Sequence, residues 1–162
     1  MRQERGFTFV EMLVVVAILA LFAWLVIPGL AGAASPIAGP VETMLEADLQ
    51  RAKTEAMARA TPMVVAANED GSAWWIAPSG DPTEAIDGSR RIFGHAGLVQ
   101  YRDTRLDVKS GFGGLVEGVR VIAVFDPLGS RDTGTPVLTL RNGGSSIASW
   151  TIPAGRTKLS VD

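Results

Sequence analysis

One carboxylate, that of Glu11, lies within an otherwise apolar run near the start of the chain. Between Phe7 and Ile27 the only other clearly polar side chain is that of Thr8. A run of about 20 apolar residues is long enough to cross a bilayer as a helix. A charged side chain inside such a helix is costly and marks a functional position. The chemistry open to Glu11 in apolar surroundings is therefore an ion pair with a cation.

The rest of the sequence offers no set of residues for catalysis. It contains one histidine and no cysteine, and no Ser/His/Asp set or phosphate-binding loop is present. His95 follows Gly94 and is expected in an exposed loop. A membrane-anchored hydrolase is thus the weakest alternative. Asp126 and Asp132 flank a polar loop that could hold Ca²⁺, but too few carboxylates gather there for an ion that takes about six to eight oxygen ligands. We expect no enzymatic activity, no metal and no cofactor.

Charges on either side of the apolar run predict its direction in a membrane. Arg2 and Arg5 precede it, and the next charge after it is Glu42. The positive-inside rule then places the N-terminus in the cytoplasm and the bulk of the chain on the other side. Two simple explanations fit this pattern. One is a signal anchor, and the other is a secretory signal peptide cleaved at Ala31-Gly32-Ala33, although its apolar core would exceed the usual ~7–15 residues.

A third explanation comes from the motif itself. Residues 5–20, Arg-Gly-Phe-Thr-Phe-Val-Glu-Met-Leu-Val-Val-Val-Ala-Ile-Leu-Ala, resemble the class III signal of type IV prepilins and type II secretion pseudopilins. In that family a prepilin peptidase cuts after a glycine, here Gly6, and methylates the new terminal amine, here on Phe7. The family's glutamate falls on Glu11 and its frequent proline on Pro28. The resemblance implies that Glu11 pairs with the Phe7 amine of a neighbouring subunit, an ion pair that fixes register more than stability.

The sequence divides into four segments on this basis. Residues 1–6 are the expected prepilin leader and residues 7–27 the transmembrane helix. Residues 28–40 form a connector of glycine, alanine and three prolines, which disfavour a regular helix. The connector is either an ordinary linker or, as the resemblance implies, a region that melts during assembly. Residues 41–162 are the expected α+β domain on the periplasmic side.

Residues 41–60 predict an amphipathic helix. Its apolar residues recur at steps of three or four and form one stripe, which consists of Val41, Leu45, Leu49, Ala52, Ala56 and Ala60. Pro40 can occupy its start, and Thr61-Pro62 ends it. Within it, residues 44–56 resemble the pattern Leu-x-x-Asp-Leu-x-x-Ala-basic-x-x-Ala that follows the membrane helix in the GspH/FimT family, which comprises the H-type minor pseudopilins and related minor pilins.

A series of short segments downstream alternates with turn signals and predicts a β-rich domain. The segments are 63–67, 73–77, 92–93, 98–102, 106–108, 119–125, 137–141, 147–152 and 158–161. In the sixth, Val119, Val121, Ala123 and Phe125 are expected to share one face, opposite Arg120. We therefore predict an α+β, type IV pilin-like fold. Its long N-terminal helix has a membrane half and an amphipathic half, and it packs on two antiparallel β-sheets.

Other residues of this domain suggest contacts. Trp74 and Trp75 put one indole on each face of a strand, so we expect one in the core, and a subunit contact stays open as an alternative for the other. Residues 125–130, Phe-Asp-Pro-Leu-Gly-Ser, resemble the family's F-x-P-x-G element. Residues 155–158, Gly-Arg-Thr-Lys, resemble its terminal Gly-Arg strand.

The sequence thus predicts a minor pseudopilin of a type II secretion system, close to the H-type subunit and near the pseudopilus tip, that helps protein export across the outer membrane. Its expected partners are the prepilin peptidase, other major and minor pseudopilins and the inner-membrane assembly platform. We expect a single-pass inner-membrane protein that enters the pseudopilus after assembly. The alternative is a FimT-like type IV minor pilin that acts in pilus assembly or DNA uptake.

The DNA-uptake alternative depends on basic residues near the C-terminus. Some FimT-like pilins are thought to bind DNA through a Gly-Arg-x-Arg strand end, which here carries Arg156 and, in place of the second arginine, Lys158. Lysine lacks the bidentate fork of arginine. With Arg141 these residues would form only a thin basic patch. The net charge of the chain is −2, so nucleic acid is the less expected partner.

Overall fold

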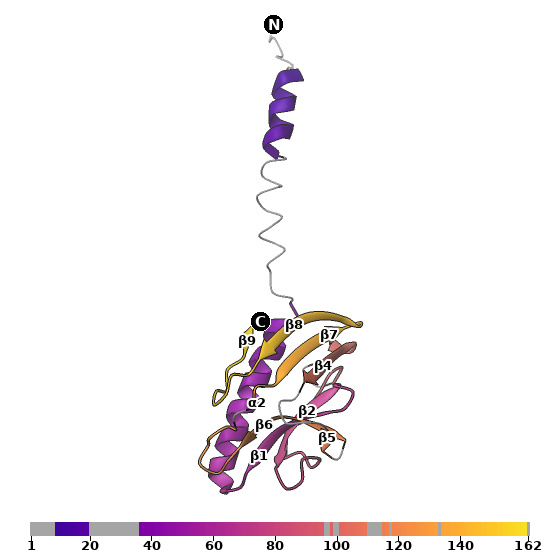
Figure 1. Ribbon diagram of the computed structural model, residues 1–162. Helices are drawn as coiled ribbons and strands as arrows, with labels where there is room; N and C mark the ends of the chain where they lie inside the picture. Colours follow the sequence, from indigo (N-terminus) through magenta and orange to yellow (C-terminus); the bar gives the residue numbers. More distant parts are fainter. Residues whose placement is uncertain are drawn as a thin grey trace. The chain divides into compact units, whose positions relative to one another are not determined.

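The computed structural model describes residues 9–19, 36–95, 98, 101–109, 115–116, 118–132 and 134–161. The chain forms two compact units, Met1–Ala34 and Ser35–Asp162. In the first unit, residues 9–19 are α-helical (Figure 1). The expected leader, the Gly6–Phe7 cleavage site and the helix break at Pro28 lie outside the described residues.

Apolar side chains are exposed on every side of the helix formed by residues 9–19. Phe9 is 80 % exposed and Leu19 is 62 % exposed, and the least exposed of its large apolar side chains, Val15, is 46 % exposed. A helix that is apolar all round needs apolar surroundings.

Within the ranges that the structure describes, no helix is both long enough and apolar enough to span a bilayer.

The second unit begins with a helix, α2, that spans Ala38–Arg59. It starts three residues before the predicted Val41, with Pro40 in its first turn, where the missing N–H has no helical partner to lose. The predicted stripe is buried from Val41 to Ala56. Its last predicted member, Ala60, is instead exposed and adopts a left-handed conformation (φ 48°) that ends the helix.

Two antiparallel sheets complete the second unit, as predicted (Figure 1). The first has the order β3-β2-β1-β6-β5, with β1 Met63–Asn68, β2 Ala73–Pro78, β3 Arg91–Ile92, β5 Leu115–Val116 and β6 Val119–Phe125. The second has the order β4-β7-β8-β9, with β4 Thr104–Lys109, β7 Val137–Asn142, β8 Ser145–Thr151 and β9 Ser160–Val161. This confirms the predicted α+β class with two antiparallel sheets.

One predicted strand, at 98–102, is wrong. The described residues there form turns: Leu98 accepts hydrogen bonds on its carbonyl from the N–H groups of Gly94 (2.8 Å) and Tyr101 (3.0 Å). The apolar Leu98 and Tyr101 that suggested a strand are buried because the turn folds onto the core. β5 was not predicted, since the residues around it read as a glycine-rich turn.

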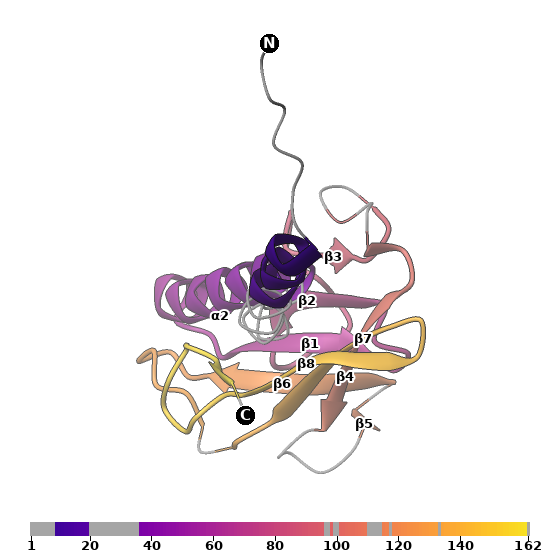
Figure 2. The ribbon, with the colours of Figure 1, turned by 90° about the horizontal axis from the view of Figure 1, so that it is seen from above.

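The core lies between α2 and the inner faces of both sheets. Figure 2 shows α2 along one side of β1 and β2, and these elements are in contact. The indole of Trp74 meets the ring of Phe93 there at a centroid distance of 5.3 Å. The sheets are joined where the backbone N–H of Leu106 on β4 donates to the carbonyl of Gly71 in the β1–β2 turn, at 2.8 Å. The main core is therefore shared by α2 and both sheets.

The prediction that one face of β6 holds all four apolar alternate residues is wrong. The register of β6 on β1 shifts between Val65 and Ala66, which pair with Ala123 and Val121. The extra residue, Ile122, makes a β-bulge, which reverses the alternation beyond it. Ala123 therefore belongs to the main core, while Val121 belongs to a second cluster on the other face of the sheet.

That second cluster also contains Trp75, and this decides against the alternative of a subunit contact at either indole. Trp75 is only 2 % exposed, because the segment after β2 folds back over it. The indole N–H donates to the carbonyl of Pro82 at 2.8 Å, and the guanidinium of Arg90 lies 4.6 Å from the ring centre. Both tryptophans are thus buried within the same chain, one in each cluster.

Candidate functional site

The first candidate site is the exposed carboxylate of Glu11 on the helix formed by residues 9–19. The large residues around it, from Phe9 to Leu19, are all apolar and exposed. An opposite charge is a natural partner for a carboxylate when such an apolar helix is buried. Gly6 and Phe7, which would supply the amine, lie outside the described residues.

The second candidate site, the C-terminal basic segment, is held against α2. Glu46 accepts the backbone N–H of Leu159 at 2.8 Å, and Thr157 donates its hydroxyl to Gln50 at 3.2 Å. The intervening Arg156 and Lys158 are exposed. The segment therefore exposes two cations, Arg156 and Lys158, while the residues that alternate with them, Thr157 and Leu159, are hydrogen-bonded to α2.

The third residue of the expected basic patch is not near the other two along the sheet. Arg141 lies at the β7–β8 hairpin, where its guanidinium donates to the carbonyl of Gly144 at 2.7 Å. Arg141 pairs with Ser146, whereas β9 pairs with β8 at Thr151. Strand residues are spaced about 3.3 Å apart, so most of the length of β8 separates the two ends. The three cations do not form one patch.

The carboxylate of Asp126 accepts hydrogen bonds from the backbone of the loop that it starts. The Asp126 carboxylate accepts the N–H groups of Leu128 (2.9 Å) and Ser130 (2.8 Å). Burial raises the pKa of Asp132, and the neighbouring Arg131 opposes that shift. No group of three or more His, Cys, Asp or Glu side chains that could hold a metal occurs among the described residues.

Arg131 is a buried cation that sequence reasoning missed. It is 7 % exposed, and its Nη2 donates to the carbonyls of Gly134 (2.8 Å), Ile152 (3.2 Å) and Pro153 (2.7 Å). Burial lowers its pKa, while Asp132 raises it. These bonds tie the β6–β7 connection to the end of β8. Arginine in a polar loop gives no sequence signal for such a position.

Asp48 is a second buried charge whose role the sequence did not reveal. Its Oδ2 accepts the indole N–H of Trp74 at 2.9 Å and the Nε of Arg91 at 3.1 Å, and its Oδ1 accepts Nη2 of Arg91 at 3.1 Å. This contact raises the pKa of Arg91, against the opposing effect of burial. Its spacing was the available signal: Asp48 lies three residues after Leu45, which places it on the buried apolar side of α2.

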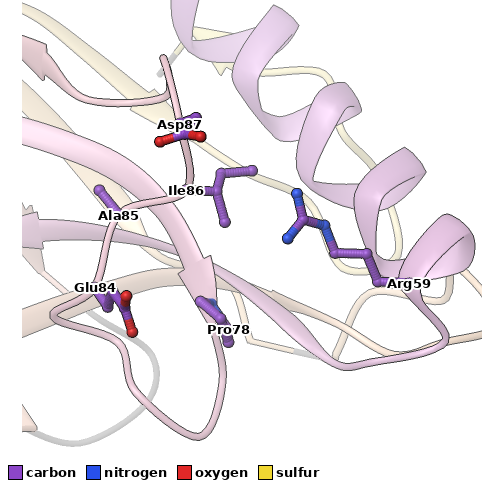
Figure 3. Close-up of a pocket in the computed structure, with 6 residues that line it drawn as sticks. All are labelled: Arg59, Pro78, Glu84, Ala85, Ile86 and Asp87. Atoms are coloured by element: carbon purple, nitrogen blue, oxygen red, sulfur yellow. The ribbon is translucent and has the colours of Figure 1, made fainter.

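A shallow pocket of about 280 Å³ lies at the C-terminal end of α2 (Figure 3). Its lining comprises Arg59, Pro78, Glu84, Ala85, Ile86 and Asp87. The guanidinium of Arg59 is bound to Glu55 at 2.8 Å, and Arg51 donates to the carbonyl of Asp87 at 2.9 Å. The pocket lining contains no serine, threonine, cysteine or histidine. His95 lies elsewhere, in an exposed turn, as predicted.

Comparison with known proteins bears on the N-terminus and on the fold. Residues 1–27 match the family model described as the prokaryotic N-terminal methylation motif. The structure of the type IV minor pilin FimU from Pseudomonas aeruginosa (strain PAO1) is similar, with a TM-score of 0.50 and 18 % identity over 75 % of this chain and 84 % of that one. The structure of the minor pseudopilin EpsH from the type 2 secretion system of Vibrio cholerae gives a TM-score of 0.49 and 13 % identity. That match covers 77 % of this chain and 94 % of the EpsH chain.

The search of curated proteins found no match.

These comparisons confirm two predictions. The chain carries a prokaryotic N-terminal methylation motif, and its second unit has the type IV pilin-like fold. The matched residues 1–27 include Glu11, the single carboxylate within the apolar run. An N-terminal processing signal is thus combined with an α+β domain of the kind seen in a minor pilin.

Proposed function

We propose that this chain is a minor pseudopilin of a type II secretion system, close to the H-type, and a structural subunit rather than an enzyme. The observation that carries the proposal is the N-terminal methylation motif at residues 1–27, joined to a type IV pilin-like domain. Pilin-like subunits act by assembly.

Processing prepares the chain for assembly in this proposal. A prepilin peptidase cuts between Gly6 and Phe7 and methylates the new amine of Phe7. The run from Phe7 to Ile27 remains as a single inner-membrane span, with residues 1–6 originally cytoplasmic and the α+β domain periplasmic. Pro28 ends the regular part of that span. The subunit then joins other pseudopilins near the tip of the pseudopilus, over the inner-membrane assembly platform.

Glu11 sets the position of each subunit in this scheme. The carboxylate pairs with the amine of Phe7 on a neighbouring subunit. In apolar surroundings, separating the two charges leaves each one unpaired, and an unpaired buried charge costs much free energy. The ion pair therefore holds neighbouring helices at one axial offset, whereas packing of their apolar faces alone would not favour any particular offset.

The effect of deleting the gene distinguishes a secretion system from a type IV pilus, because the first predicts reduced secretion and the second predicts loss of pili. Deleting the gene in its host should reduce the amount of extracellular protein exported by the secretion system, and the wild-type chain should restore it. A Gly6→Leu variant, which blocks cleavage before Phe7, should not restore export. The uncleaved variant is identified by its mass, which retains residues 1–6. Intact secretion combined with loss of pili would contradict the proposal.

The second candidate is a type IV minor pilin, and the likeness to FimU favours it. DNA uptake is the most specific form of this candidate and can be tested with the full-length protein in detergent. We expect no salt-sensitive shift of duplex DNA, because Arg156 and Lys158 are separated from Arg141. A shift that weakens steeply with salt, and that is lost in Arg156→Ala, would support DNA binding instead.

A further inference from the structure

Residues 156–161, here called the strap, follow the turn after β8 and lie beside α2 (Figure 1). Two hydrogen bonds join the strap to the helix. The backbone N–H of Leu159 donates to Glu46 at 2.8 Å, and the hydroxyl of Thr157 donates to Gln50 at 3.2 Å. Residues four apart on a helix project from the same side. The strap therefore follows that side of α2 over about one helical turn.

Most of the strap is at the surface. Leu159 is half-buried and packs against the main core. The β9 part of the strap pairs with β8 over two residues. Segments with few buried contacts are those that open locally while the rest of a protein stays folded. The exposed residues of the strap are Arg156, Lys158, Ser160 and Val161.

Opening of the strap would leave its partners on α2 in contact with water. Gln50 is exposed and Glu46 is half-buried, so both side chains can bind water once the strap has moved. A polar group that becomes solvated costs little free energy, whereas one that stays buried without a partner costs much. The main losses on opening are therefore the apolar contact of Leu159 and the short β9 ladder.

The chain just before the strap is anchored much more firmly. Ile152 is fully buried in the main core, and its N–H donates to the carbonyl of Pro136 at 3.2 Å. The buried guanidinium of Arg131 donates to the carbonyls of Ile152 (3.2 Å) and Pro153 (2.7 Å). Displacing this part would leave a buried cation without these acceptors, which is costly. The chain is thus held in place up to Pro153.

Ala154 and Gly155 lie between the anchored part and the strap, and they can serve as a hinge. Both residues are exposed. Gly155 has a φ of 69°, which glycine adopts without steric penalty, and nothing lies within 4 Å of the position that a Cβ would take. The N–H of Arg156 closes this turn by donating to the carbonyl of Pro153 at 3.1 Å. Rotation at these two residues can move the strap while Pro153 stays in place.

We propose that the strap is a latch, which opens and closes on α2 about Ala154 and Gly155 while the rest of the domain stays folded. The two states differ in the charge that this side of α2 presents. In the closed state the exposed cations of Arg156 and Lys158 are held there, on either side of the residue that contacts Gln50. In the open state these cations move away and the carboxylate of Glu46 faces water. All of these contacts lie within the domain, so the latch does not depend on the proposed function.

Hydrogen exchange of two amides in the full-length chain in detergent tests this proposal. The amide of Leu159 reports on the strap, and that of Ile152 reports on the anchored part. Leu159 should be protected, but roughly a hundredfold less than Ile152, because opening the latch breaks fewer contacts than unfolding the domain. Low concentrations of denaturant should speed exchange at Ile152 and leave Leu159 nearly unchanged, since local opening exposes little surface.

The variant Glu46→Ala removes the acceptor of the Leu159 N–H. It should lower the protection of Leu159 by roughly tenfold, the effect of losing a hydrogen bond to a charged group at a partly exposed site. The protection of Ile152 should not change. Glu55→Ala is the matched control, because it removes a carboxylate of the same helix that pairs with Arg59 instead of the strap. It should leave the protection of Leu159 unchanged.

Three results would overturn the latch. Equal protection of Leu159 and Ile152 would mean that the strap opens only when the domain unfolds. Exchange at Leu159 as fast as in an unstructured peptide would mean that there is no closed state. A loss of protection in Glu46→Ala that is the same at both amides would mean that the variant weakens the whole domain rather than the strap.

Discussion

Asp48 and Arg91 form a two-point ion pair that joins α2 to β3. Oδ1 of Asp48 lies 3.1 Å from Nη2 of Arg91, and Oδ2 lies 3.1 Å from Nε. The Asp48 side chain is 2 % exposed, whereas that of Arg91 is 33 % exposed. The carboxylate also accepts the indole N–H of Trp74. Its role is thus to complete the hydrogen bonds of two partners at the boundary of the core.

Replacing Asp48 with alanine should destabilise the domain by about 2–4 kcal/mol. The change leaves the indole N–H of Trp74 without its acceptor and the guanidinium of Arg91 without its counter-charge. Partial exposure of Arg91 keeps the loss below that of a fully buried pair. The measurement is the free energy of unfolding of the full-length chain in detergent, followed by tryptophan fluorescence.

The control for this prediction is Glu55→Ala. Glu55 pairs with Arg59 on the exposed side of α2 at 2.8 Å, and such surface pairs contribute only about 0.3–0.5 kcal/mol. If Asp48→Ala destabilises the chain no more than Glu55→Ala does, the buried pair is not a significant source of stability.

Gly71→Ala should be more harmful than Gly88→Ala, although both glycines have nearly the same backbone conformation. Their φ angles are 69° and 66°, so both replacements carry the penalty of about 1–2 kcal/mol for a left-handed residue. A Cβ on Gly71 would also overlap the carbonyl of Leu106, whereas nothing lies within 4 Å of one on Gly88. Equal unfolding free energies for the two variants would contradict the close contact between the sheets.

Asp70 should stabilise the fold only when it is ionised. The backbone N–H of Ser72 donates to its carboxylate at 2.9 Å and lowers the pKa of Asp70 below its ordinary value of 3.8, with a further contribution from Arg105. Since the folded-state pKa is the lower one, the stabilisation is present above pH 3.8 and is lost as the pH falls through the folded-state value.

The variant Asp70→Asn isolates that effect, because the amide oxygen can still accept the N–H of Ser72. The variant should be slightly less stable than the wild type at neutral pH. The two proteins should converge as the pH falls below 3.8. Unfolding curves measured across this range check the prediction, and a difference that stays constant with pH would contradict it.

Glu11→Ala should reduce incorporation into filaments more than about tenfold, because it leaves the amine of a neighbouring Phe7 unpaired in apolar surroundings. Cleavage after Gly6 and the amount of protein in the membrane should not change. The measurement is the fraction of the chain in sheared filaments. Glu11→Asp is the matched control, since it keeps the charge on a shorter side chain and should recover part of the incorporation. Unchanged incorporation of the alanine variant would exclude the ion pair.

Local patterns in the sequence were sufficient for the main elements of the fold. The apolar stripe from Val41 to Ala56 predicted the buried face of α2, because its period is set by helix geometry alone. Strands such as β1 and β2 were predicted to within a residue, since turn residues mark their ends. The setting of Glu11 was likewise readable, because one carboxylate in a long apolar run is a local feature.

Features that depend on tertiary packing could not be predicted in the same way. The bulge at Ile122 reverses the faces of β6, and nothing in that apolar run distinguishes the extra residue from its neighbours. Trp75 is covered by a loop whose path is set by contacts such as the hydrogen bond to Pro82. The carbonyl acceptors of Arg131 come from distant segments.

The bond between Leu159 and Glu46 has a consequence for the order in which the domain can be completed. The two residues are 113 positions apart, and Thr157 meets Gln50 across 107 positions. α2 and the segment from Thr157 to Leu159 that contacts it are therefore far apart in the sequence. Contacts of such long sequence separation form late. The contacts of Thr157 and Leu159 with α2 are therefore expected to form after the local contacts of the helix and the hairpins.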